Sequence, residues 1–385
     1  MRVLIVGLLL CGNAFGQTEH WVAAWGTSQQ LYRSGVPPTP RPPSPPNPAR
    51  RFGIPAPLES LNNQTVKMIA RTSIGGKSVR VRLESALGGG TVMFGSASIG
   101  IIDGASHPLT FSGKPSATLY AGATLVSDPV ALDLPPLAHV AVSVYVPGEV
   151  RLPTSHTFAL HTTTISKPGE PDITRESYYW LAGIDVLAPA NVGTVVTFGD
   201  SITDGDQSTP ETDGAWPSVL AGRLRGVGVV NAGISGNRLL GDNGGGLARL
   251  YHDALSQPGI RWMTILEGIN DITGGVREPE RLIAAYQQAI AAAHELGVKV
   301  YGCTITPFGG SNVFNDERES VREAVNTWIR TSGAFDGVID FDKAVRDPAD
   351  PKRLRKEADS PDMLHPANPG YKIMGESIDL KLFNR

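Results

Sequence analysis

The sequence predicts an α/β fold built on a parallel sheet and preceded by a β-sandwich of jelly-roll type. After about residue 188, short apolar or β-branched runs alternate strictly with stretches of helical periodicity. This alternation implies right-handed crossovers and helices on both faces of a parallel sheet. Before residue 188 the sequence has short β runs separated by Gly and Pro turns, without helical periodicity. The change of pattern divides the chain into two parts.

Strands and helices are expected to alternate through the second part. The strands are expected at 195–198, 229–232, 263–266, 298–304 and 338–341, and the helices at about 215–225, 247–256, 278–296, 315–331 and 369–383. In the helix at 278–296, apolar residues recur at helical spacing, which indicates an ordinary core-facing side.

Three segments are expected along the 385 residues: a signal peptide at 1–16, a β-rich N-terminal domain at 17–188 and an α/β domain at 189–385. This length is enough for two hydrophobic cores. Within the β-rich domain, the stretch at 37–48 is so dense in proline that it cannot form a helix or a central strand. We expect it to be a long surface loop of polyproline type.

The first residues have the pattern of a secretory leader. An early basic residue, Arg2, is followed by an apolar run at 3–10 and by small residues before Gln17. The apolar run is too short to cross a bilayer, so we expect a secreted or periplasmic protein with no membrane insertion. Cys11 suggests lipid attachment, but Leu10 in front of it is not the small residue that such processing prefers. Simple cleavage is therefore the favoured interpretation.

Composition excludes several classes of function. A net charge of -3 offers no polybasic face, which disfavours nucleic acid and anionic lipid as partners. Removal of the leader would leave Cys303 as the single cysteine, so no intramolecular disulfide is expected, and Cys303 is expected to be a small buried apolar side chain. The histidines show no metal-ligand spacing, so we expect no metal. His156 and His161 are expected to pack at the domain boundary.

Three residues have the types and positions needed for nucleophilic catalysis. Ser201 follows the buried run TVVTF, at the carboxyl end of a predicted parallel strand, where open α/β sheets place their chemistry. Near the C-terminus, Asp362 and His365 lie three residues apart in a proline-bracketed loop. A serine hydroxyl needs an imidazole to take its proton, and a carboxylate on the other ring nitrogen fixes the tautomer. The alternatives are a helix cap at Ser201 and a solvated loop at 362–365.

Two further turns could supply donors to an oxyanion. Gly236 lies in the turn VVNAGISGN and Asn270 in the turn WMTILEGIND, and each turn follows an apolar run. Backbone N–H groups at glycines and an Asn amide suit the stabilisation of an acyl-transfer oxyanion. Taken singly, Gly236 could instead be a glycine needed for chain geometry, and Asn270 a helix cap.

In this order, the segments GDSITDG, ISGN, GIND and DMLH resemble the four signature blocks of the SGNH (GDSL-type) hydrolase family. The resemblance covers about residues 190–385 and implies a flavodoxin-like sheet. It also implies a nucleophile, a base, an orienting acid and an oxyanion hole that need no cofactor. The residues it assigns are Ser201 as nucleophile, His365 as base, Asp362 as orienting acid, and the N–H groups of Ser201 and Gly236 with the Asn270 side chain as oxyanion donors.

The segments WVAAWGTSQQ and LNNQTVKMIARTS are similar to the opening of the β domain in some secreted acyl esterases of plant polysaccharide breakdown. Together the two resemblances imply a secreted serine ester hydrolase that cleaves small acyl groups, most plausibly acetyl, from a carbohydrate. A lipase, lysophospholipase or arylesterase is the alternative within enzymes. A carbohydrate-binding or adhesion protein with an inactive hydrolase part is the alternative of another class. The oligomeric state is left open.

Overall fold

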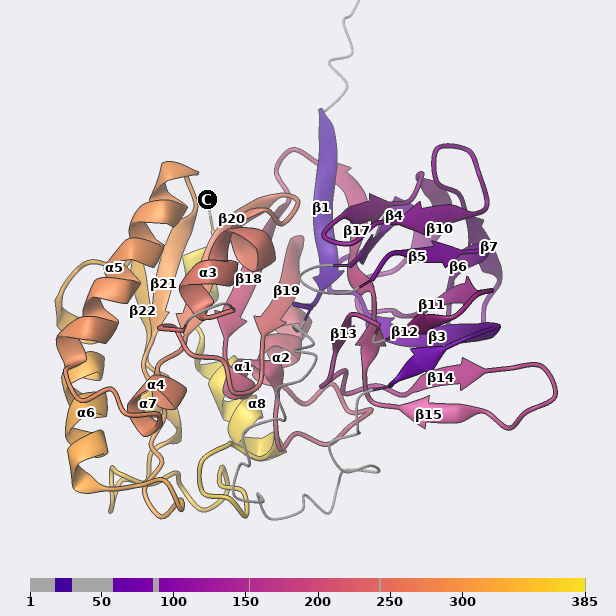
Figure 1. The fold of residues 1–385 in the computed structure, drawn as a ribbon. Coiled ribbons are helices and arrows are strands. Elements are labelled where there is room, and N and C mark those ends of the chain that lie inside the picture. Colours follow the sequence, from indigo (N-terminus) through magenta and orange to yellow (C-terminus); the bar gives the residue numbers. More distant parts are fainter. Residues whose placement is uncertain (1–17, 30–57, 86–89, 152, 242–243, 385) are drawn as a thin grey trace, which may run out of the picture.

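The computed structural model describes residues 18–29, 58–85, 90–151, 153–241 and 244–384, which form a β-rich part and an α/β part side by side (Figure 1). The expected leader at 1–16, with Cys11, and the proline-dense stretch at 37–48 lie outside these residues. The predicted fold class is confirmed, since a parallel sheet with helices follows a region of mostly antiparallel strands.

The α/β part is organised around one parallel sheet in the order β19-β18-β20-β21-β22. In chain order this is 2-1-3-4-5, the flavodoxin-like arrangement. Because β19 and β20 flank β18 on opposite sides, the chain changes winding direction at β18, and the carboxyl end of β18 opens on the crevice where such sheets bind ligands. The strands are β18 (Gly193–Gly199), β19 (Val227–Gly233), β20 (Ile260–Leu266), β21 (Lys299–Cys303) and β22 (Gly337–Ile339).

Two groups of helices cover this sheet. Helices α2, α7 and α8 contact one another, and α5 contacts both α3 and α6, as expected for helices on two faces of a doubly wound sheet. The helices are α1 (Ser201–Asp204), α2 (Trp216–Arg223), α3 (Gly246–Arg249), α4 (Ile269–Thr273), α5 (Pro279–Glu295), α6 (Asp316–Thr331), α7 (Phe341–Val345) and α8 (Asn368–Ser377). A π-helical turn, Leu250–Leu255, continues α3, and a 3₁₀ turn, Leu380–Phe383, follows α8.

The last helix is shorter than the sequence pattern predicts. The expectation of one helix at 369–383 is wrong, because α8 ends at Ser377 and Ile378 adopts an extended backbone. The Arg223 guanidinium donates to the carbonyls of Gly375 and Ile378 at 2.5 and 3.0 Å, which satisfies acceptors that a continuing helix would have used. The Asp379 side chain then caps the 3₁₀ turn.

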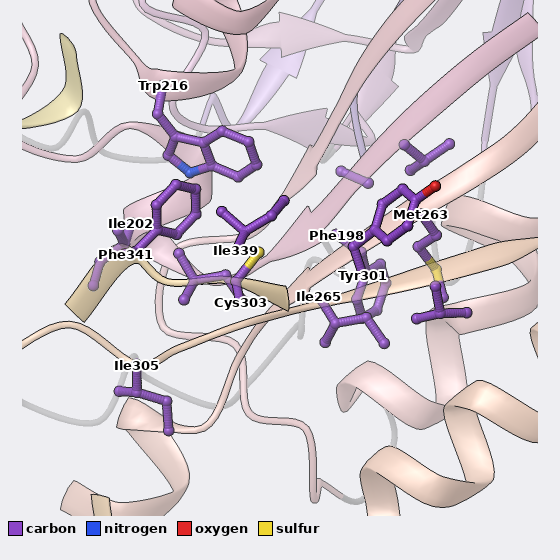
Figure 2. Packing of buried hydrophobic residues seen from close by; sticks show 14 of the residues in the cluster. Phe198, Ile202, Trp216, Met263, Ile265, Tyr301, Cys303, Ile305, Ile339 and Phe341 are labelled. Carbon is purple, nitrogen blue, oxygen red and sulfur yellow. The ribbon is translucent and has the colours of Figure 1, made fainter. Parts of the chain in front are cut away.

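The core of the α/β part lies between the sheet and its helices (Figure 2). Every residue of β18 is buried, as expected for a strand covered on both faces. The rings of Trp216 on α2 and Phe341 on α7 lie 5.1 Å apart and join these helices over the sheet. Cys303 is fully buried in the same cluster, and burial raises the pKa of its thiol, which confirms its prediction as a small apolar side chain.

The β-rich part is a sandwich of two antiparallel sheets, in the orders β1-β17-β4-β10, with β9 on β4, and β15-β14-β3-β11-β6-β7. Alternate residues of β11 are buried, and they share one cluster with Val79, Val81 and Leu83 of β4. The main strands are β1 (Glu19–Gly26), β3 (Gln64–Arg71), β4 (Gly76–Glu84), β6 (Ser96–Ile101), β7 (Ser106–Leu109), β9 (Thr124–Val126), β10 (Val130–Leu134), β11 (His139–Val146), β14 (Thr163–Ser166), β15 (Ile173–Arg175) and β17 (Leu181–Pro189). Shorter ones are β2 (Ser60–Leu61), β5 (Val92–Phe94), β8 (Ala117–Leu119), β12 (Val150–Arg151), β13 (Ser155–His156) and β16 (Tyr178–Tyr179).

Strand β1 joins the two parts. It pairs along its length with β17 of the sandwich, and just beyond its end Thr27 forms a parallel bridge with Asn231 of β19. Val22 and Ala24 are buried in the sandwich core, whereas Ala23 between them is buried in the α/β core. Alternate side chains of one strand therefore pack in two cores. Strand β17 ends at Pro189, and β18 of the parallel sheet begins at Gly193.

None of the helices in the described ranges is long and apolar enough to cross a membrane.

Candidate active site

Ser201 lies at the end of β18, as the first residue of α1. The carboxylate of Asp200 accepts a hydrogen bond from the Ile202 N–H at 2.9 Å and so caps this short helix. The turn requires glycine at 199, because a Cβ there would lie 2.1 Å from Thr203 Oγ1 and 2.6 Å from a backbone carbonyl of β20. The cap belongs to Asp200, so Ser201 is free of the capping role that was its alternative interpretation.

The structure brings His365 and Asp362 to Ser201. His365 Nε2 lies 2.8 Å from Ser201 Oγ, and His365 Nδ1 lies 2.7 Å from Asp362 Oδ2. Ser201 and His365 are 4% and 7% exposed, so both reacting groups are almost enclosed. Three side chains that the sequence singled out therefore form one continuous hydrogen-bonded chain, although 164 residues separate Ser201 from His365.

Asp362 is held rigidly by its own loop. Its Oδ1 accepts hydrogen bonds from the N–H groups of Leu364 and His365 and from the Ser360 hydroxyl, each at 2.9 Å. Burial opposes ionisation of this carboxyl, but the hydrogen bond and charge of His365 and the two backbone donors outweigh it and hold the pKa of Asp362 well below its usual range. Asp362 is thus an ionised acceptor that orients the imidazole with Nδ1 protonated.

Gly236 and Asn270 follow the two strands that flank β18. Gly236 has φ +78° in a turn closed by the Asn237 N–H on the Ile234 carbonyl at 3.0 Å, a conformation that favours glycine. Asn270 is on α4, and its Nδ2 donates to the Asn237 carbonyl at 2.9 Å, which leaves its second amide hydrogen for another acceptor. In the part of the chain that the structure describes, the N–H groups of Ser201 and Gly236 donate no hydrogen bond.

The α/β part of the chain matches a known family. Residues 197–373 match the model of the GDSL-like lipase/acylhydrolase family. The chain carries a GDSL-like lipase/acylhydrolase domain. No curated protein matches the sequence.

Solved structures are similar to the GDSL domain in fold. A putative lipolytic protein of the G-D-S-L family from Desulfitobacterium hafniense is 24% identical, with 48% of this chain and 96% of that chain covered and a TM-score of 0.39. A member of the same family from Veillonella parvula is 23% identical, with 50% and 100% covered and a TM-score of 0.39. A family two carbohydrate esterase from Clostridium thermocellum, in complex with cellohexaose, is 16% identical, with 84% and 94% covered and a TM-score of 0.39. Likenesses at this level do not bear on the substrate of this chain.

Sequence analysis missed a carboxylate next to the base. Asp206 Oδ2 lies 3.9 Å from His365 Nε2. Burial opposes protonation of His365, but the negative charges of Asp206 and Asp362 prevail and raise the pKa of its imidazole above the ordinary value. The signal was present in the sequence, because Asp206 is five residues after Ser201 in GDSITDGD.

Sequence analysis also missed a group of buried acidic residues close to Ser201. Burial raises the pKa of Asp200 to about 7 and that of Asp271 to about 6, and it raises the pKa of Glu267 well above its usual range. The guanidinium of Arg249 lies among them, and Arg249 is 4% exposed. Its guanidinium donates to Glu267 Oε1 at 3.3 Å, to Asp253 Oδ2 at 3.0 Å and to the carbonyls of Gly199 and Ala232, at the carboxyl ends of β18 and β19, at 2.8 Å.

One group among the described residues has the composition of a metal site. The ligand atoms of His139, His161 and Asp213 lie within 4.8 Å of one another. Arg71 Nε lies 3.4 Å from Asp213 Oδ2, and His161 also contacts Glu211 Oε2 at 3.0 Å. Burial disfavours the charged form of His161, but its bonds to Asp213 and Glu211 raise the pKa of this histidine to about 9. Protonated His161 and Arg71 therefore balance the charges of Asp213 and Glu211. The expectation of no metal stays a prediction.

The expected boundary positions of two histidines are confirmed. His156 and His161 are both buried in the β-rich part, and both contact carboxylates of the GDSL part, Asp204 and Asp213.

Arg249→Met is predicted to destabilise the protein by about 3–5 kcal/mol, because it removes the buried guanidinium that donates to Asp253, Glu267 and the carbonyls of Gly199 and Ala232 and leaves these acceptors without it. Urea unfolding followed by circular dichroism measures the change. Arg151→Met is the control, since Arg151 forms an exposed ion pair with Glu149 whose loss costs about 0–1 kcal/mol. Equal stabilities of the two variants would contradict the prediction.

Proposed function

We propose that this chain is a serine ester hydrolase that removes small acyl groups, in particular acetyl, from a carbohydrate. The observation that carries the proposal is the continuous chain from Asp362 through His365 to Ser201, at 2.7 and 2.8 Å. A serine at the end of a parallel strand, with an imidazole on its hydroxyl and an ionised carboxylate behind the imidazole, is the arrangement that activates a serine for attack on a carbonyl. Membership of the GDSL-like hydrolases supports the same chemistry.

In this mechanism Ser201 Oγ attacks the ester carbonyl while His365 Nε2 takes its proton. The imidazolium is stabilised by Asp362 through Nδ1–H. The oxyanion accepts hydrogen bonds from the N–H groups of Ser201 and Gly236 and from the Asn270 amide. When the tetrahedral intermediate collapses, the alcohol leaves with the proton from His365. Water, activated by the same imidazole, then attacks the acyl-enzyme and releases the carboxylic acid and free Ser201.

Two observations support a small acyl group on a polar alcohol. Ser201 and His365 are almost enclosed, and we expect the acyl group to bind in a correspondingly small subsite. The similarity of WVAAWGTSQQ and LNNQTVKMIARTS to secreted polysaccharide esterases favours a carbohydrate as the alcohol. Secretion, on the evidence of the leader-like pattern at 1–16, belongs to the same proposal.

The experiment that tests the function is a panel of p-nitrophenyl esters of increasing chain length beside acetylated xylan, pectin and glucomannan. Wild type is expected to prefer acetyl esters, whereas Ser201→Ala and His365→Ala lose about 10⁴-fold or more of the turnover, and Asp362→Asn keeps part of it. Preference for long chains would favour the lipase alternative. Turnover in Ser201→Ala equal to that of wild type would exclude Ser201 as the nucleophile.

Asn270→Ala is predicted to lower kcat by roughly 10²–10³ with a smaller change in KM, because the hydrogen bond of its amide to the oxyanion strengthens in the transition state. Steady-state kinetics on p-nitrophenyl acetate give both constants. An unchanged kcat with a much higher KM would instead make Asn270 a residue that positions the substrate.

Asp206→Asn is predicted to move the acidic limb of the kcat/KM profile to lower pH. The base must be neutral, so kcat/KM of wild type rises as pH passes the raised pKa of His365, and removal of the Asp206 charge lowers that pKa. Asp133→Asn, on an exposed position of β10, is the control and should leave the limb in place. A limb that stays fixed or moves to higher pH in Asp206→Asn would contradict this assignment.

A further inference from the structure

His156 connects the β-rich part to the helix that begins with Ser201. It belongs to β13, which pairs with β16, and it is 3% exposed. Its Nδ1 lies 2.7 Å from the Ser28 carbonyl, just beyond β1, and its Nε2 lies 3.0 Å from Oδ1 of Asp204, the last residue of α1. Asp204 is itself 2% exposed.

Both ring nitrogens of His156 face acceptors. A carbonyl can only accept a hydrogen bond, so Nδ1 carries a hydrogen and donates it to the Ser28 carbonyl, while Nε2 bonds the Asp204 carboxyl group. Burial opposes protonation of His156, but Asp204 and the Ser28 carbonyl outweigh it and raise the pKa of His156.

The second oxygen of Asp204 holds the turn that contains Gly236. Asp204 Oδ2 accepts from the Ser235 N–H at 2.8 Å and from the Ser235 hydroxyl at 2.7 Å. Ser235 and Gly236 are the two central residues of the turn from Ile234 to Asn237. The peptide group between Ser235 and Gly236 carries the Gly236 N–H, so a fixed Ser235 fixes the direction of that donor.

The other end of the same turn is also tied to the β-rich part. Arg249 Nε donates to Asn237 Oδ1 at 2.8 Å, and its Nη1 contacts the Ser28 hydroxyl at 3.3 Å. Ser28 thus contacts both His156 and Arg249, and the turn is held at Ser235 and at Asn237.

We propose that His156 is a positioning residue for the oxyanion donor Gly236 and acts through Asp204 and Ser235. The inference rests on the proposed ester hydrolase function. Oxyanion donors accelerate the reaction because they are oriented before charge develops, so a turn that can reorient loses part of this effect. Replacement of His156 removes the hydrogen bond that fixes Oδ1 of Asp204, so the side chain of Asp204 can move and its hold on Ser235 weakens. A misdirected Gly236 N–H stabilises the transition state less, whereas binding of the substrate before the reaction changes little. We therefore expect a lower kcat with little change in KM.

The test compares His156→Gln with His161→Gln. His161 is a matched control because it is also buried in the β-rich part and also contacts two acceptors. Its partners are Glu211 and Asp213, whereas His156 contacts Asp204, which holds Ser235 of the turn. On p-nitrophenyl acetate, His156→Gln is expected to lower kcat by roughly 10- to 100-fold, less than the 10²–10³ for loss of a donor, with KM changed by less than about twofold. His161→Gln is expected to keep kcat within about twofold of wild type. Equal kcat values in the two variants would overturn the proposal.

Ser235→Ala provides a second variant that leaves His156 in place. It removes the hydrogen bond from the Ser235 hydroxyl to Asp204, and a fall in kcat is expected. The variant with both His156→Gln and Ser235→Ala is expected to be little worse than His156→Gln alone, because both substitutions act through Asp204. If His156→Gln does not fold, an unchanged kcat in Ser235→Ala overturns the proposal and a fall supports it.

Hydrogen exchange of the peptide around 232–238 separates this proposal from the proposed function. Faster exchange in His156→Gln than in His161→Gln supports the positioning role whether or not wild type turns over esters. Absence of ester turnover in wild type would overturn the proposed function only. Equal exchange in an active enzyme overturns the positioning role and leaves the proposed function standing.

Discussion

The parallel pairing of β18 with β19 and β20 is the constraint on which the candidate site depends. Gly199 is opposite Gly233 on one side and Leu266 on the other, so three strands end at the same level. The loops that follow them carry Ser201, Gly236 and Asn270, which are far apart in sequence. A strand in this position is covered on both faces, so its register is fixed by burial as well as by hydrogen bonds. The register of these strands therefore sets the relative positions of Ser201, Gly236 and Asn270.

The parallel sheet and the candidate catalytic residues could be predicted from the sequence, because both depend on local patterns. The alternation of strand and helix gave the parallel sheet, and Ser201, Asp362 and His365 stood out by residue type and position. Contacts across the two parts could not be predicted in the same way. His156 and Asp204 are 48 residues apart, and no periodicity links them. The end of α8 was missed because it depends on Arg223, more than 150 residues earlier.

Burial of charged groups near the site costs free energy, and two of these groups, Asp271 and Arg249, form hydrogen bonds with the backbone. Asp271 accepts from the N–H groups of Leu239 and Leu240, just after the turn that contains Gly236. Arg249 donates to carbonyls at the ends of β18 and β19. Buried ion pairs add little net stability because desolvation cancels most of their attraction. Here they fix the directions of strand ends and loops around Ser201, which hydrophobic packing alone does not specify.

Strand β1 packs its alternate side chains in two cores, and this has a consequence for how the protein is made. Its partners in β17 and the bridge at Asn231 are encoded more than 150 residues after it. During synthesis β1 therefore leaves the ribosome long before either partner exists, and its apolar residues stay without their final cover until both sheets are available. Contacts of such long range are slow to form and leave strands exposed in the meantime. The contacts of Ala23 in the α/β core can form only after the whole sandwich has been synthesised.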